Sequence, residues 1–230
     1  MKRQYFAIID TETTNDDKVL DFAMVICDRK QRVYHQCAVI IAENYNLDNL
    51  WTKQSEQGHF NPANLTRRIK RYNDMLEQGS RIIRSVNVVN KFINRCIEHY
   101  NPVLTAYNLI FDQGKCANTG IVLDNFANRF CLWHSAASII GHNKQYLKFV
   151  LENHLFNNPT EKGNMTYKTN AEVVAGFING RYIKEPHTAL EDILEFELPI
   201  LGHITSKKKW LEKTVSYNWK NFQVRDYFHA

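Results

Sequence analysis

The chain contains 230 residues, of which 44% are hydrophobic and 23% charged, and its formal net charge is +5. This length and composition predict one folded domain with a substantial core. They exclude an intrinsically disordered chain, and no apolar stretch is long enough for a membrane span. The mild basicity fits an anionic partner such as nucleic acid, although many unrelated proteins share it. Five cysteines without a CxxC pair, and the lack of a signal peptide, predict reduced thiols in an intracellular, cytoplasmic protein.

Five strands are predicted from runs of strand-forming residues, at 5–9, 19–28, 32–41, 103–107 and 129–133. The first run is uninterrupted and apolar, which is typical of a central strand buried on both faces. The polar stretch between the second and third runs predicts a hairpin, so the first three strands form a meander.

Helices are predicted between and after these strands, at 62–77, 86–100, after Asp112, at 134–140 and 145–155, from a Thr169–Glu172 capping box to Gly180, and from Thr188 to Leu201. A meander followed by alternating helices and strands predicts a mixed five-stranded α/β sheet flanked by helices. One domain is expected over residues 1–205. Residues 206–230 form a basic, aromatic tail that is expected to pack on it, and the loop and helix from 42 to 84 look specific to this protein.

Acidic residues follow two of the predicted strands. Asp10 and Glu12 come at the end of the first strand, and Asp112 follows the fourth. Because side chains alternate along an extended chain, Asp10 and Glu12 are expected to point to the same side. Two carboxylates placed there repel each other unless a cation lies between them. Ordinary loop acids remain an alternative for this stretch taken alone.

A histidine and an aspartate flank the start of the last helix. Thr188 and Glu191 form a capping-box pattern, which makes Thr188 the expected N-cap. His187 then lies at N′ and Asp192 at N4, two positions that touch in a hydrophobic staple. An imidazole and a carboxylate cannot form a hydrophobic contact of this kind, but together they are typical of a functional site. A first-turn carboxylate also favours the helix dipole, so these residues alone leave both interpretations open.

Taken in order, these segments resemble a known family. DTETT at 10–14, NLIFD at 108–112 and HTALED at 187–192 are similar to the three sequence blocks of the DEDDh 3′→5′ exonucleases. This DnaQ-like group includes polymerase proofreading exonucleases, ribonuclease T and oligoribonuclease. The resemblance spans roughly residues 5–201 and implies a ribonuclease H-like fold. Two departures are Tyr107, where many relatives carry histidine, and the lack of a glycine after the first block.

The resemblance implies a two-metal hydrolysis of phosphodiester bonds from 3′ ends, which releases nucleoside 5′-monophosphates. It implies that His187 is the general base and that two Mg²⁺ or Mn²⁺ ions are held by Asp10, Glu12, Asp112 and Asp192. Carboxylate oxygens are hard ligands that suit these ions, and an imidazole can accept a proton near neutral pH.

The expected partners are single-stranded or frayed 3′ ends, with Thr13, Asn108 and Phe111 as candidate substrate contacts; a core position is the alternative for Phe111. DNA is the first expectation and RNA the second, because no residue reads the sugar. A polymerase or another replication protein is a further possible partner, and no membrane is expected. The rival functions are a catalytically idle nucleic-acid-binding module and a structure-specific endonuclease.

Two basic runs and one aromatic loop are weaker candidates for nucleic-acid contacts. RRIKRY at 67–72 and Lys207–Lys209 would meet phosphates, although solvated helix faces explain such runs more often. Trp51, His59 and Phe60 would stack on bases, as aromatic residues do in single-strand binders.

Overall fold

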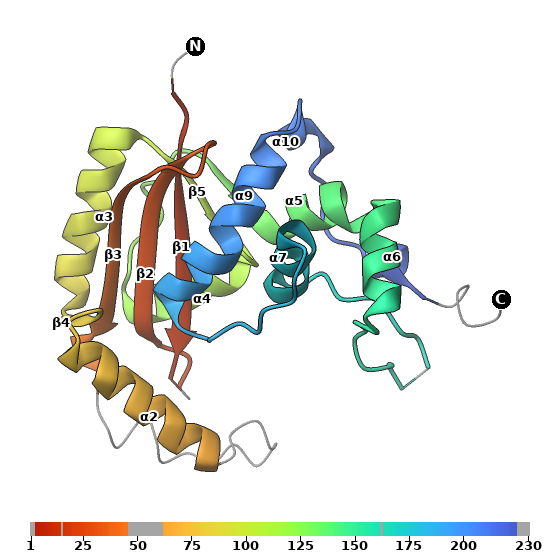
Figure 1. Cartoon of the computed structure of the whole chain (residues 1–230). Helices are drawn as coiled ribbons and strands as arrows, with labels where there is room; N and C mark the ends of the chain where they lie inside the picture. The colour runs from red at the N-terminus through yellow and green to blue at the C-terminus, as the bar shows by residue number, and fades with distance from the viewer. Residues whose placement is uncertain (1–2, 15, 46–61, 162, 225–230) are drawn as a thin grey trace.

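A computed structural model describes residues 3–14, 16–45, 62–161 and 163–224, with backbone only for 62–68. Its centre is one six-stranded sheet with the strand order β4-β3-β2-β1-β5-β6, flanked by helices on both faces (Figure 1). The strands are β1 (Tyr5–Thr13), β2 (Val19–Asp28), β3 (Val33–Ile41), β4 (Ile82–Arg84), β5 (Val103–Ala106) and β6 (Arg129–Cys131). The aromatic loop residues Trp51, His59 and Phe60 lie outside the described residues.

The first three strands form the predicted antiparallel meander, and the later strands join the sheet in parallel. β1 pairs antiparallel with β2 and parallel with β5, while β4 and β6 extend the two edges. This arrangement confirms the predicted ribonuclease H-like mixed sheet flanked by helices.

The prediction of five strands missed β4. This edge strand is three residues long, and all of its side chains are exposed. Neither an apolar run nor an alternation marks so short a segment in the sequence. β1 also continues four residues beyond the predicted 5–9, so Asp10 and Glu12 lie within the strand.

The helices are α2 (Pro62–Glu77), α3 (Val86–Tyr100), α4 (Leu109–Thr119), α5 (Leu132–Ala136), α6 (Lys144–Glu152), α7 (Ala171–Asn179), α8 (Ala189–Asp192), α9 (Leu198–Thr205) and α10 (Trp210–Lys213), with short 3₁₀ helices η1 (Ala42–Asn44) and η4 (Trp219–Phe222) and π-helical segments η2 (Ala137–Gly141) and η3 (Ile193–Glu197). The predicted last helix is thus α8, η3 and α9 in succession, and it ends at Thr205.

Two predicted helix starts were wrong. α4 begins at Leu109, so Asp112 lies inside its first turn and not before it. α7 has Asn170 as its N-cap in place of Thr169. The Thr169 hydroxyl instead accepts a hydrogen bond from the Trp133 indole at 3.0 Å, so a tertiary contact replaces the predicted cap.

Side chains of β1 alternate between two hydrophobic cores. Phe6 and Ile8 pack with residues of α7 and α9, while Ala7 and Ile9 pack with residues of α3 and α4. Continued along the strand, this alternation sends Asp10 and Glu12 to the α7–α9 side and Thr11 to the α4 side. The position of the acids therefore follows from the burial pattern of the strand.

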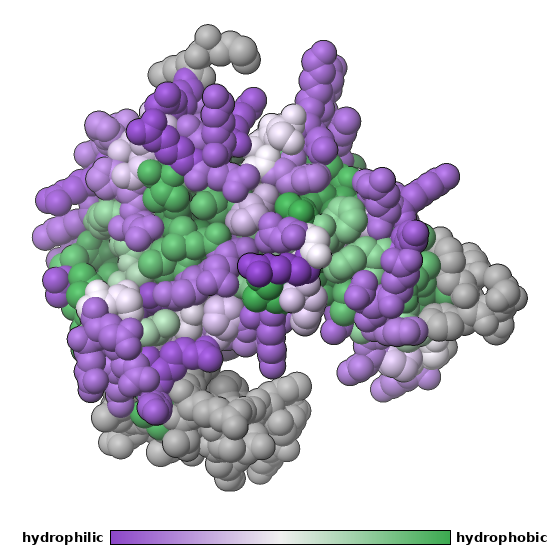
Figure 2. Space-filling model, in the orientation of Figure 1, coloured by the Kyte–Doolittle hydropathy of each residue, from purple (hydrophilic) through white to green (hydrophobic). Residues whose placement is uncertain are grey.

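Residues after α9 also contact the body of the protein. The ring of Trp210 lies 4.8 Å from that of Phe130, centroid to centroid, and the Phe222 ring stacks on Tyr217. Lys207–Lys209 are exposed next to Gln4, at the amino end of β1. Hydrophilic side chains project from this α10 end of the molecule in Figure 2. Among the described residues, no helix has the length and apolar character needed to cross a bilayer.

Candidate active site

Six carboxylates and one imidazole line a single pocket of about 300 Å³ at the carboxyl end of β1. The residues are Asp10, Glu12, Asp112, Glu185, His187, Asp192 and Glu197. The structure thus brings together all five residues predicted for catalysis and metal binding. Of the three predicted substrate contacts, Asn108 and Phe111 line the pocket, whereas Thr13 is not among its lining residues. Phe111 is 46% exposed, which contradicts the alternative of a core position.

Asp112 reaches the pocket from the first turn of α4. The residue before this helix, Asn108, has a left-handed backbone with φ of 75°, which turns the chain sharply from β5 into α4. Asp112 is 2% exposed, and its Oδ1 accepts a hydrogen bond from the Thr11 hydroxyl at 2.8 Å. Thr11 faces α4 because it lies between Asp10 and Glu12 on the strand. The alternation of side chains along β1 therefore points Asp10 and Glu12 to one side of the sheet and lets Thr11, on the other side, hold Asp112.

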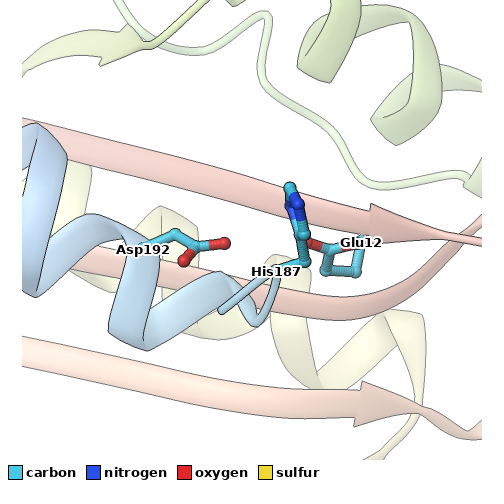
Figure 3. A group of neighbouring side chains, drawn as sticks. All are labelled: Glu12, His187 and Asp192. Carbon is cyan, nitrogen blue, oxygen red and sulfur yellow. The ribbon is translucent and has the colours of Figure 1, made fainter. Parts of the chain in front are cut away.

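Glu12, His187 and Asp192 form the tightest group in the pocket. Each offers one possible ligand atom, and these three atoms all lie within 4.8 Å of one another. Figure 3 shows Glu12 on β1, Asp192 on α8 and His187 between them, on the segment that enters α8. The predicted proximity of N′ and N4 side chains is therefore present here.

The predicted capping box is only partly right. Thr188 is the N-cap of α8, but no hydrogen bond from its side chain caps the helix. Its backbone N–H donates to Asp192 Oδ2 at 2.9 Å, so Asp192 takes the part expected of Glu191. Glu191 instead pairs with Arg81, at 2.5 Å between Nη2 and Oε2. A long-range ion pair has displaced the local cap.

Glu197 is a pocket residue that lies outside the three sequence blocks and was not predicted. It lies in the π-helical segment η3, is 3% exposed, and accepts a hydrogen bond from the Tyr107 backbone N–H at 3.1 Å. A signal was present, because Glu197 is four residues from both Ile193 and Leu201 and so interrupts the apolar stripe of this helix. π-helical segments occur often at functional sites.

Glu185 was also missed, and no periodic pattern marks it. It lies two residues before His187 in a segment without regular structure, and its backbone N–H donates to Glu172 Oε1 at 2.9 Å. Only the folded chain brings Glu185 into the pocket.

Burial and mutual repulsion raise the pKa of most of these acids. For Asp10, burial and the charges of Glu197 and Asp112 raise the pKa well above its ordinary value. Burial raises the pKa of Asp112 to about 7, and burial with the Glu185 and Glu12 charges raises that of Asp192 to about 8. The pocket therefore concentrates negative charge that a cation would relieve.

The donor set fits divalent cations. Asp192 Oδ1 and Glu197 Oε2 are buried without a hydrogen-bond partner among the described residues. Buried carboxylate oxygens are costly unless they are paired or coordinate a metal. A set of carboxylates with one imidazole suits Mg²⁺ or Mn²⁺ better than softer metals, since thiolates are absent from the pocket lining.

Comparisons with known proteins give only distant structural similarity. No protein-family model matches the chain, and no curated protein matches it in sequence. Similar solved structures include exonuclease I with the inhibitor BCBP (11% identity, TM-score 0.44) and E. coli exonuclease I with the oligonucleotides 5cy-dT13 (13%, 0.49) and 5cy-dA13 (10%, 0.46). The matches cover 88%, 92% and 91% of this chain, but only 41%, 42% and 42% of theirs. The chain therefore spans about two fifths of their length, and similarity this distant assigns neither an activity nor a site residue.

Proposed function

We propose that this protein is a metal-dependent 3′→5′ exonuclease that removes single nucleotides from DNA and releases nucleoside 5′-monophosphates. The observation that carries the proposal is the pocket in which the four acids of the three sequence blocks meet His187. A binding module gains nothing from buried acids that repel one another. This cost disfavours the catalytically idle alternative.

Asp10, Glu12, Asp112 and Asp192 are the proposed holders of two Mg²⁺ or Mn²⁺ ions. Such a pair of ions, when bound, supplies an activated water and neutralises the charge on the departing 3′ oxygen. Asp10 is central among them, because burial and four other pocket acids all raise the pKa of its carboxyl group. Thr11 holds Asp112 in place through the hydroxyl hydrogen bond, so this acid is oriented before any cation arrives.

His187 is the proposed general base. Its side chain is exposed at the pocket and lies within 4.8 Å of both Glu12 and Asp192, atom to atom. A neutral imidazole accepts the proton of the attacking water at a ring nitrogen. Holding the histidine outside the helix leaves the ring accessible to substrate and water.

Asn108 and Phe111 are proposed to hold the terminal nucleotide. The exposed Phe111 ring offers a stacking surface for a base, and Lys115 Nζ, which pairs with Asp17 Oδ1 at 2.6 Å, lies 4.7 Å from the centre of that ring. A pocket of about 300 Å³ is at the small end of ligand sites. Thr13 stays a prediction.

The test is incubation with 5′-labelled DNA and RNA oligomers, with Mg²⁺ or with EDTA. We expect a ladder of shortening products from DNA in Mg²⁺, none in EDTA, and resistance of a strand with a blocked 3′ end. Asp10→Asn should abolish the products. Faster digestion of RNA would make the alternative, an exoribonuclease, correct. Release of the labelled 5′ nucleotide first would contradict the polarity, and cleavage of circular single-stranded DNA would identify an endonuclease. A polymerase or other replication partner remains a prediction.

A further inference from the structure

The backbone at His187 has an unusual conformation. Its φ of 57° lies in the left-handed region, which is strained for a residue with a β-carbon and persists where the surrounding structure imposes it. His187 is exposed, whereas Thr188 and Ala189, the next two residues, are buried. Contacts on either side of the histidine hold this part of the chain.

Arg71 fixes the residue before His187. Its Nη1 donates a hydrogen bond to the Pro186 carbonyl oxygen. Arg71 lies on α2, 115 positions earlier in the chain. In Figure 1, α2 and the segment that leads into α8 lie at the same end of the sheet. The helix of the 42–84 segment thus contacts the peptide that carries the proposed general base.

Arg81 fixes the residues after His187. This guanidinium is 1% exposed and forms a fork with Asp21, at 2.8 Å from Nε to Oδ1 and 3.1 Å from Nη2 to Oδ2. It also binds Glu191, at 3.2 Å from Nη1 to Oε1 and 2.5 Å from Nη2 to Oε2. Asp21 Oδ2 in turn accepts the Ala189 backbone N–H at 3.1 Å. One buried cation therefore joins β2 to the first turn of α8.

We infer that residues 71–81, the end of α2 and the turn into β4, are a positioning arm for His187. Arg71 and Arg81 bracket the histidine through Pro186 on one side and Ala189 with Glu191 on the other. This inference rests on the proposed function, and it assigns a role to a segment that the family resemblance leaves unexplained. Neither arginine is among the pocket-lining residues, so both act through the segment that they hold, Arg71 at the Pro186 carbonyl and Arg81 at the Glu191 carboxylate.

The test compares two variants of α2 in the full chain, each of which removes one positive charge. Arg71→Gln removes the hydrogen bond to Pro186, whereas Lys70→Gln removes the same charge one residue away. We expect Arg71→Gln to lower kcat by about 10-fold with KM within about twofold, because a small misplacement of a reacting group costs that much or more. Lys70→Gln should leave kcat unchanged. Arg71→Lys should restore part of kcat, since an ammonium also donates to a carbonyl oxygen. Mn²⁺ affinity should be the same in all four proteins.

A second variant and a second measurement keep the arm testable apart from the activity. Glu191→Gln breaks only the outer part of the Arg81 network, because the Arg81–Asp21 fork remains. Hydrogen exchange of amides 187–189 should quicken in Arg71→Gln and in Glu191→Gln, and it should not change in Lys70→Gln. Equal exchange and equal kcat in Arg71→Gln and Lys70→Gln would overturn the inference. A rise in KM alone in both variants would also overturn it, because it would mean that α2 only attracts the nucleic-acid substrate. If wild type shows no nuclease activity, the proposed function fails, and hydrogen exchange alone decides whether the arm exists.

Discussion

At the residue scale, the site combines an imidazole and a carboxylate at the start of one helix, α8. His187 stands outside α8 with a left-handed backbone, and Asp192 lies inside its first turn with one oxygen bonded to the Thr188 N–H. The second Asp192 oxygen has no hydrogen-bond partner among the described residues. The histidine is therefore suited to exchanging a proton, and the aspartate to holding a cation.

Substituting His187 separates these two roles. If it is the general base, His187→Ala should lower the single-turnover rate by about 10²–10⁴-fold at saturating Mg²⁺. Mn²⁺ affinity and binding of the oligonucleotide should persist, because the carboxylates remain. His99→Ala, on α3 at the other face of the sheet, is the matched control and should have wild-type rates. A His187→Ala rate within about threefold of wild type would show that the histidine is not the base.

Glu197 should belong to the metal-binding set although no sequence block contains it. Glu197→Gln keeps the shape of the side chain and removes its charge next to Asp10. We expect Mn²⁺ affinity to fall by about 10-fold or more, as it does when a supporting carboxylate is lost from a metal site. Glu195→Gln, two residues earlier and exposed, is the control. Isothermal titration decides, and equal affinities for the two variants would exclude Glu197 from the site.

At the scale of elements, local signals predicted what local interactions determine. The apolar run of β1, the hairpin after β2 and the three acidic blocks were all legible, because each depends on neighbouring residues. β4, the pairing of Glu191 with Arg81 and the presence of Glu185 in the pocket were not, because each depends on contacts between segments far apart in the sequence. Glu197 falls between these cases. Its interruption of an apolar stripe is visible in the sequence, but its position in the acidic pocket is not.

The Arg81 network should also contribute strongly to stability. Arg81→Met leaves the Asp21 carboxylate buried without its cation, and breaking a buried pair in this way costs about 3–5 kcal/mol. Lys148→Met removes one partner of the exposed Lys148–Glu152 pair, which should cost less than about 1 kcal/mol. Urea unfolding of both variants measures the difference. A similar small loss in each would mean that the buried pair is not required for the fold.

At the scale of the whole molecule, the acidic pocket should couple stability to pH and to metal. Asp112 and Asp192 have pKa values of about 7 and about 8 when folded, against about 4 when unfolded. The folded state therefore holds more protons between these values, so these two acids make the metal-free protein less stable as pH rises from about 4 to about 8. A cation that binds the deprotonated acids would remove this penalty.

The expected result is an Mn²⁺-induced increase in Tm that is larger at pH 8 than at pH 5. Thermal unfolding in EDTA and in Mn²⁺ at both pH values measures it. Asp192→Asn should reduce the difference between the two pH values, because one of the titrating acids is gone. An Mn²⁺-induced increase that is the same at pH 5 and pH 8 would contradict the coupling.

The pocket draws its acids from nearly the whole length of the chain, from Asp10 on β1 to Glu197 in η3. During synthesis, a ribosome adds about 5–20 residues per second, so these two residues are made roughly 10–40 seconds apart. Throughout that interval the growing chain carries Asp10 and Glu12 but lacks His187, Asp192 and Glu197. The proposed hydrolytic centre can therefore close only after Glu197 has been made, and a growing chain that has not yet reached α8 and η3 would present no working site to the nucleic acids around it.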